Sequence, residues 1–442
     1  MFPHLSNAEF FIFILTLWCL CSLITTWREL VQWQMEKPKK KGKRRRLKPQ
    51  TPNDCELCRL GLHEPPKPGP SQVTPWSKIK NSSGRKKRSN SDGKACPRRC
   101  CVYYGITEAH IHALVSNGWR GKNEKIRQWK CQACGCKFTD RRQTPMYRLK
   151  TASKRVAQVM MALAEGVDLS ATTRIFDYHH TTVSRWLTRG GEHGRMLHHQ
   201  SFREFICEHL QLDEMTTRVK SHNERVWLWT AVAAQSKVLL VIHLGGRKKQ
   251  DAQTFVHLVK ERLATGCLPV FTSDGLRMYF YALTAHFGTW IWPEGARKFH
   301  WQTDKELLYG QFRKVRKGFR ITNIYTLVQW GERQVIKKRL QAIGLTGKIQ
   351  SSFVERLNLT LRELTAPLSR RTWSMAFDEA HLLLHVEWVR CYYHFSRKHL
   401  SLKRELANGR NRYLTPAVAA GVASRRYEVR EILMMSLYPD TG

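Results

Sequence analysis

Two aspartates follow short apolar runs that are typical of buried strands. Asp213 comes directly after residues 209–212 (HLQL), and Asp274 follows residues 269–273 (PVFTS). Runs of this length and composition predict strands that end at the acidic residue. We therefore expect both carboxylates at strand ends. Glu214 follows Asp213 directly, so its side chain should point to the opposite face of the strand, and it is the weaker candidate.

A third carboxylate lies in residues 353–362 (FVERLNLTLR), where the pattern predicts a helix. Offsets of three and seven residues put Glu355, Asn358 and Arg362 on one face of that helix. A carboxylate followed two turns later by a guanidinium suits a site that binds metal and also holds a phosphate. Glu306 and Glu332 are alternative carboxylates, but neither is followed by this Asn and Arg spacing.

Three carboxylates that meet in space could hold two divalent ions, because Mg²⁺ and Mn²⁺ prefer hard oxygen ligands. One ion would activate water or a 3′-hydroxyl, and the other would stabilise the leaving oxygen of a phosphodiester. In this hypothesis Asp213 bridges both ions, Asp274 holds one and Glu355 holds the other. Asn358 and Arg362 would orient the phosphate.

The elements around these residues predict an α/β fold. Strand patterns over 209–213, 226–232 and 238–244 precede an amphipathic helix over 251–263 and a strand over 269–273. Three strands, a helix and a fourth strand, with Asp on the first and fourth, describe a ribonuclease-H-like domain with a mixed sheet. Its first and fourth strands lie side by side, which would bring Asp213 and Asp274 to one crevice.

Two cysteine pairs upstream have the spacing of a structural zinc site. Cys96 and Cys101 precede Cys131 and Cys134 by about thirty residues, and two such pairs supply four thiolates for a tetrahedral Zn²⁺. We predict these four ligands in a small zinc ribbon. Cys100 is an alternative to Cys101, and buried thiols without metal are the alternative to a zinc site.

Residues 151–190 predict a helix-turn-helix. Helical patterns cover 154–165, 169–176 and 181–189, with a turn at 178–180. In this layout the last helix enters the major groove of DNA. Its outward-facing residues would be Thr182, Ser184, Arg185 and Arg189. A helical bundle that links two domains is the alternative.

The composition favours a polyanionic partner. The 442 residues contain 75 Lys and Arg against 35 Asp and Glu, a net charge of +40. Each phosphate that such a protein neutralises releases counterions and favours binding. Charge alone does not separate an enzyme from a chromatin or ribosomal protein. The 13 Cys suit metal binding in a reducing compartment better than a disulfide framework.

The N-terminal region differs from the rest. Residues 10–27 carry no charge and are followed by Arg28, so they could form a membrane anchor with the following chain in the cytoplasm. A partner-binding helix is the alternative interpretation. Residues 37–48 contain nine Lys or Arg, typical of a solvated linker. Cys55 and Cys58 in this linker form half of a metal motif without a clear second half.

Four fragments in combination resemble the DDE transposases of small bacterial insertion sequences, most closely the group of insertion sequence one. The fragments are QLDEM at 211–215, TSDGL at 272–276, FVERLNLTLR at 353–362 and LSRRTW at 368–373. The resemblance covers roughly residues 95–400. It implies metal-dependent cleavage of DNA and strand transfer, with Asp213, Asp274 and Glu355 as the triad. It also implies that Arg370 and Arg371 orient phosphate.

The resemblance further implies double-stranded DNA as the partner, both terminal repeats and target, a homo-oligomer on DNA, and a place in the cytoplasm with the nucleoid. A DNA-binding regulator that does not cut is the alternative function. We expect six segments along the chain: an apolar segment at 1–35, a linker at 36–94, a zinc ribbon at 95–148, a helix-turn-helix at 149–192, a catalytic domain at 203–400 with an insertion at about 289–344, and a basic tail at 401–442.

Overall fold

The computed structural model describes residues 73–79, 90–121, 124–220, 225–318, 320–406 and 409–437. The apolar segment 10–27, the basic run 37–48, and Cys55 with Cys58 lie outside these residues. Within the described ranges, no helix combines the length and the apolar character needed to cross a membrane.

The elements follow one another as small strands, then helices, then a larger sheet with helices. In chain order they are α3 (Trp76–Ile79), β1 (Leu114–Arg120), β2 (Ile126–Cys131), β3 (Lys137–Thr139), α4 (Ser153–Ala164), α5 (Leu169–Phe176), α6 (His180–Ser201), β4 (His209–Arg218), β5 (Arg225–Ala233), β6 (Leu239–Gly245), α7 (Lys249–Arg262), β7 (Val270–Ser273), α8 (Met278–His286), β8 (Gly288–Ile291), β9 (His300–Thr303), β10 (Leu308–Lys317), β11 (Arg320–Trp330), α9 (Arg333–Ala342), α10 (Ser352–Leu364), η2 (Ala366–Leu368), α11 (Glu379–Phe395), β12 (Lys403–Glu405), β13 (Asn411–Tyr413), α12 (Pro416–Ala419) and α13 (Val429–Met434).

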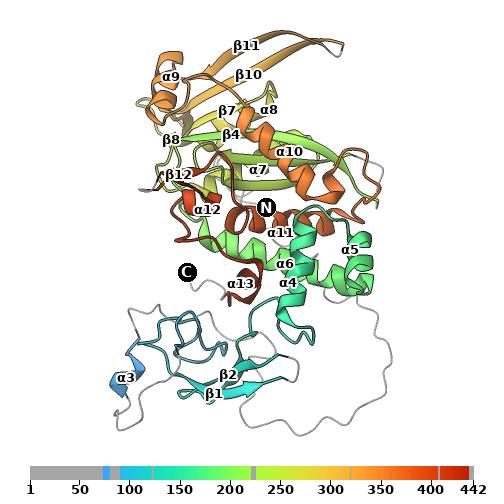
Figure 1. Ribbon diagram of the computed structural model, residues 1–442. Coiled ribbons are helices and arrows are strands. Elements are labelled where there is room, and N and C mark those ends of the chain that lie inside the picture. Colours follow the sequence, from blue (N-terminus) through green and yellow to red (C-terminus); the bar gives the residue numbers. More distant parts are fainter. Residues whose placement is uncertain are drawn as a thin grey trace, which may run out of the picture. The chain divides into compact units, whose positions relative to one another are not determined.

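The largest sheet among the described residues has six strands in the order β11-β10-β7-β4-β5-β6 (Figure 1). β4, β5 and β6 form an antiparallel meander. β7 pairs in parallel with β4 on one side and with β10 on the other, and β11 pairs antiparallel with β10. The sheet is therefore mixed, and the predicted α/β class is confirmed at this level.

Helices cover both faces of this sheet where its central strands are apolar on both sides. On one face, Trp229 of β5 packs against Phe255 of α7 and Tyr279 of α8. On the other face, Leu228 of β5 belongs to a cluster with Leu357 of α10. Adjacent residues of one strand thus serve two separate cores, as the alternation of side chains along a strand requires.

Strand β4 is longer than the sequence pattern predicted. It runs on to Arg218, whereas the pattern placed its end at Asp213. The reason is the partner strand: β5 pairs with every residue of β4 from Leu210 to Arg218. Asp213 therefore lies in the middle of a strand, while Asp274 directly follows the end of β7.

Residues 308–330, inside the range expected to be an insertion, belong to the sheet. Leu308 and Tyr309 of β10 are buried and pair with Val270 and Phe271 of β7. Figure 1 shows β10 and β11 as a long hairpin that reaches beyond the neighbouring strands. Residues 289–302 form part of a separate compact unit, in which Trp290 contacts Trp301 edge to face.

The helical segment before the sheet is held by one long helix. The sequence predicted an end at residue 189, but α6 continues to Ser201 and packs against α11. A Cβ at Gly191 would lie 2.2 Å from the carbonyl oxygen of Leu384, so only glycine permits this approach. The close helix pair extends α6 because its second half buries residues such as Leu197.

The cysteine-rich segment forms its own small core. β1, β2 and β3 make a three-stranded sheet, and Leu114, Trp129 and Phe138 are buried in it. Its loop residue Glu124 pairs with Arg141 at 2.5 Å and Arg430 at 3.1 Å. Arg430 belongs to α13, so the second pair connects the module to this C-terminal helix.

Candidate functional site

A cluster of carboxylates lies where β4 and β7 run side by side. One oxygen from each of Asp213, Glu214 and Asp274 can be chosen so that all three lie within 4.8 Å of one another. The parallel register pairs Leu212 with Ser273, and an aspartate follows each of these two residues in the chain. Oxygen ligands this close form a donor set that fits a hard divalent cation.

The carboxylates perturb one another. Burial, followed by the charges of Glu214 and Asp274, raises the pKa of Asp213 to about 7. Burial and the charge of Asp274 raise the pKa of Glu214 to about 7. A bound cation would relieve this repulsion, because like charges that share a site disfavour ionisation. Strongly shifted carboxylates that converge on one point are typical of functional sites.

Glu214 is tied more firmly than its neighbours. Its Oε1 accepts hydrogen bonds from Arg247 at 2.7 and 3.1 Å, and its Oε2 accepts one from the hydroxyl of Tyr279 at 2.9 Å. The guanidinium of Arg247 in turn stacks on Trp227 at 4.5 Å. Both carboxylate oxygens therefore have protein partners. Glu214 adds negative charge to the cluster, and it is less available as a metal ligand than Asp213.

Asn358 connects helix α10 to the cluster. Its Nδ2 donates a hydrogen bond to Oδ2 of Asp213 at 2.8 Å. Its Oδ1 accepts one from the hydroxyl of Thr230 on β5 at 3.1 Å. These two contacts define the orientation of the amide, and Asn358 is almost fully buried.

Gln211 positions the same helix, a role that the sequence reasoning missed. This fully buried side chain on β4 accepts hydrogen bonds at its Oε1 from the backbone N–H groups of Phe353 and Val354, each at 3.0 Å. Its Nε2 donates to the carbonyl oxygen of Gln350 at 2.9 Å. The start of α10 has no cap from its own Ser351, and Gln211 fills that role across the sheet. A polar residue between Leu210 and Leu212 in an apolar strand was the available signal.

Glu355 is not brought into the carboxylate cluster. Its Oε1 accepts hydrogen bonds from Nζ of Lys314 at 2.7 Å and from the hydroxyl of Ser351 at 2.6 Å. It nevertheless lies one turn before Asn358 on α10, on the side of the helix that faces β10. Of the predicted triad, Asp213 and Asp274 thus lie close together, whereas the carboxylate of Glu355 pairs with a lysine.

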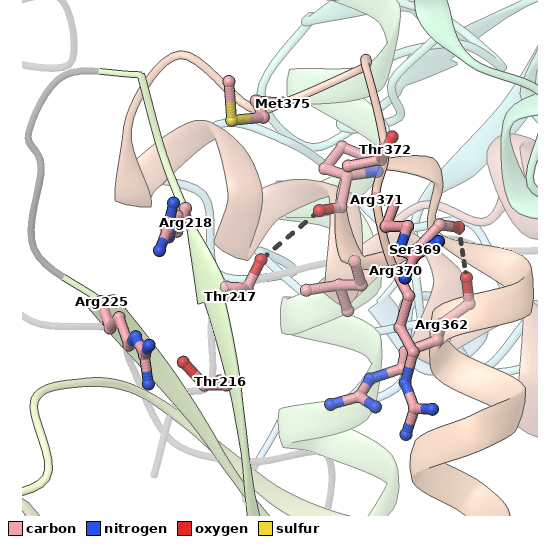
Figure 2. Close-up of a pocket in the computed structure, with 12 residues that line it drawn as sticks. Thr216, Thr217, Arg218, Arg225, Arg362, Ser369, Arg370, Arg371, Thr372 and Met375 are labelled. Carbon is pink, nitrogen blue, oxygen red and sulfur yellow. Dashed lines mark hydrogen bonds between the residues drawn. The ribbon is translucent and has the colours of Figure 1, made fainter.

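The predicted phosphate-orienting arginines lie together. Arg362 is one turn after Asn358 on α10, and Arg370 and Arg371 follow η2. All three line one pocket with residues of β4 (Figure 2). The hydroxyl of Ser369 donates a hydrogen bond to the carbonyl oxygen of Arg362 at 2.7 Å, which holds the segment after η2 against α10.

A second candidate metal site is formed by four cysteines. The sulfurs of Cys96, Cys101, Cys131 and Cys134 lie within 4.8 Å of one another, with 3.5 Å between Cys96 and Cys134 and 3.8 Å between Cys101 and Cys131. A tetrahedral site with Zn–S bonds of about 2.3 Å requires S–S separations of about 3.8 Å. The four thiols therefore fit such an ion, and Cys101 rather than Cys100 belongs to the group.

The local backbone and electrostatics agree with metal binding at these thiols. Gly135, with a φ of 72°, lets the chain turn so that its N–H donates to the carbonyl oxygen of Cys131. Hydrogen bonding with Cys101 and the other thiols raises the pKa of Cys96, and hydrogen bonds from Cys101 and Cys131 lower the pKa of Cys134. The cluster can exchange its protons for a cation.

The four residues predicted to contact DNA from the helix-turn-helix have different surroundings. Ser184 lies 3.2 Å from Nε2 of His381. Arg189 donates to the carbonyl oxygens of Pro145 and Tyr147. Arg185 is exposed, and Thr182 is half-buried. Two of the four thus hold α6 against the rest of the fold.

In comparisons with known proteins, no protein-family model matches this chain, and no curated protein matches it significantly.

Proposed function

We propose that this protein is a DDE-type transposase that cleaves DNA and joins the cut strand to a target. The observation that carries the proposal is the convergence of Asp213 and Asp274 from adjacent parallel strands, with oxygens within 4.8 Å. The sheet order supports a ribonuclease-H-like domain, since β4 lies between its meander partner β5 and the parallel strand β7. The chain's high positive charge supports DNA as the substrate.

In this mechanism, Asp213 and Asp274 would hold Mg²⁺ or Mn²⁺, and Glu355 would complete the site from α10. When bound, the ions would activate a water or 3′-hydroxyl nucleophile and neutralise charge at the scissile phosphate. Asn358 holds Asp213 in its orientation through the 2.8 Å hydrogen bond. Arg362, one turn further on α10, would hold the phosphate by charge-assisted hydrogen bonds.

The cysteine cluster would bind a structural Zn²⁺ in a zinc-ribbon module. Four thiolates suit zinc better than a harder cation. The core of this module is small, and a metal would add folding free energy that so few apolar residues cannot supply. This module and the helix-turn-helix would both bind DNA. In the helix-turn-helix, Arg185 is the exposed candidate contact.

One observation favours a second function, a DNA-binding protein that does not cut. The carboxylate of Glu355 pairs with Lys314 at 2.7 Å instead of joining Asp213 and Asp274. An ammonium at this position would compete with a metal ion for Glu355. The transposase proposal therefore requires that Lys314 releases Glu355 when substrate and metal bind.

The test is nicking and strand joining of a duplex that carries the DNA flanking this gene, measured with and without Mg²⁺. We expect cleavage with Mg²⁺ that is lost in Asp213→Asn, Asp274→Asn and Glu355→Gln. Glu363→Gln is the matched control, since Glu363 is an exposed glutamate on the same helix α10. Tight binding without any cut, by wild type and variants alike, would establish the regulator instead.

A further inference from the structure

A pocket beside the carboxylate cluster is lined by five arginines. Arg218 and Arg225 come from the ends of β4 and β5, Arg362 from α10, and Arg370 and Arg371 from the segment after η2 (Figure 2). No acidic residue is among the described residues that line it, and its volume is about 580 Å³. We call it the arginine pocket.

The arginines of this pocket repel one another. Arg218 and Arg225 are direct partners in the antiparallel ladder of β4 and β5, an arrangement that is destabilising for like charges. Burial and then the charge of Arg370 lower the pKa of Arg362. In Figure 2 the side chains of Arg362 and Arg370 lie beside each other. Two repelling pairs around one pocket indicate a site that an anion completes.

The pocket is also well supported. The hydroxyl of Thr217 on β4 donates to the carbonyl oxygen of Pro367 at 3.4 Å, which ties β4 to η2. Arg371 has a φ of 54°, a left-handed conformation that costs roughly 1–2 kcal/mol for a residue other than glycine. The segment thus keeps a strained backbone at the point where it presents its arginines to the pocket, as functional sites often do.

Exposed aromatic side chains follow the lining segment of the arginine pocket along the chain. Trp373, directly after the lining residue Thr372, is 98% exposed, and Phe377 is 68% exposed. Sites for single-stranded nucleic acid combine such aromatic side chains with a basic groove, because an unpaired base offers its faces for stacking. In a duplex the base faces are covered by neighbouring base pairs. The pocket and Trp373 together therefore favour an unpaired strand over a duplex.

We propose that the arginine pocket binds phosphates of an unpaired DNA strand and that Trp373 stacks on one of its bases. The proposal rests on the proposed function in taking DNA as the substrate. Arg362 follows Asn358, which contacts Asp213, by one helical turn, so a strand cut at the cluster could continue into the pocket. Arg218 and Arg225, which lie outside the quoted sequence motifs, gain a role in this proposal.

The experiment measures binding of a short labelled single-stranded oligonucleotide to the full chain by fluorescence anisotropy, in EDTA so that nothing is cleaved. The double variant Arg218→Gln/Arg225→Gln should weaken binding roughly tenfold or more. The slope of log affinity against log salt should fall in magnitude by about 1.4, for two lost phosphate contacts. The matched control is Arg404→Gln/Arg412→Gln, another cross-strand arginine pair, on β12 and β13, which should change affinity less than about twofold.

Two further measurements test whether Trp373 contacts a base and whether the ligand is a nucleic-acid strand or free phosphate. Trp373→Ala should weaken binding about fivefold or more and should restore the fluorescence of a 2-aminopurine base that wild type quenches. Millimolar inorganic phosphate should not displace the strand. Displacement by phosphate, or an equal loss of affinity for the single strand and for a blunt duplex in the double arginine variant, would overturn the assignment to an unpaired strand.

The fold and the enzyme function are tested separately. Because Arg218 and Arg225 repel each other, their double variant should melt no lower than wild type, so weaker binding would not reflect unfolding. Unchanged binding in this variant would overturn the inference even if Mg²⁺-dependent cleavage is found. Arginine-dependent strand binding in a protein that never cuts DNA would uphold the inference and refute the proposed function.

Discussion

Replacing Asp213 by Asn should stabilise the protein when no divalent ion is present. Burial and the neighbouring carboxylates raise the pKa of Asp213 from its ordinary 3.8 to about 7. Such a difference corresponds to about 4 kcal/mol of unfolding free energy that the ionised folded state loses above pH 7. Because Asp213 is only half-buried, solvent screening reduces this figure, and we expect Asp213→Asn to gain about 2–4 kcal/mol at pH 8.

The sign of the pH dependence follows from the raised pKa. The unfolded chain loses its proton near pH 4, whereas the folded protein keeps it until about pH 7. The loss of unfolding free energy that Asp213 causes therefore grows as the pH rises from about 4 to about 7, and it stays constant at higher pH. At pH 5 the advantage of Asp213→Asn should fall to less than half of its value at pH 8. The hydrogen bond from Asn358 can persist, because the new amide still offers an oxygen.

The assay is urea unfolding in EDTA at pH 5 and pH 8, with Glu363→Gln as the control for loss of one exposed carboxylate. Repeating it with Mg²⁺ should remove most of the advantage of the variant at pH 8. Wild type would gain about 2.7 kcal/mol at a hundred times its dissociation constant, and Asp213→Asn would gain much less. A variant less stable than wild type at pH 8 in EDTA would refute the reasoning that crowded carboxylates dominate this site.

Three other changes test the surroundings of the site. Gln211→Met removes the cap of α10 and leaves two backbone N–H groups without acceptors, so urea unfolding should show a loss of about 1–3 kcal/mol; an unchanged stability would mean that α10 is held by packing alone. Cys131→Ser should lose stoichiometric zinc in metal analysis of the purified protein, whereas Cys136→Ser should keep it, and equal zinc in both would contradict the ligand set. Lys314→Gln should lower the Mg²⁺ concentration for half-maximal cleavage a few-fold by freeing Glu355, and a higher requirement would show that Lys314 assists the site.

The strands and helices near the site were largely predictable because their signals are local. The apolar runs before Asp213 and Asp274 are strands, and residues 353–362 are helical, as their periodicity predicts. The strand boundary at Asp213 was wrong, since β5 pairs beyond it and no local pattern encodes a partner. For the same reason the strands β10 and β11 fell inside a range that looked like an insertion.

The side-chain partners within the site could not be predicted from the sequence. Gln211 caps a helix that begins more than a hundred residues later, and Glu355 pairs with Lys314 from a strand that sequence reasoning did not assign. Such contacts depend on which elements become neighbours in the sheet. The cysteine ligands were easier to predict. Within each pair the spacing is short, so the site requires only that the two pairs come into contact.

By itself, the sequence determined the chemical inventory: which carboxylates, thiols and arginines exist, and which of them follow strands or share a helical face. Only the tertiary structure decided that Asp213 and Asp274 converge while Glu355 pairs with a lysine. It also decided that Arg218, Arg225, Arg362 and Arg370 line one pocket. The physical reason is that periodicity reports how a segment is buried, whereas the meeting of distant side chains depends on strand order, register and the packing of helices on both faces of the sheet.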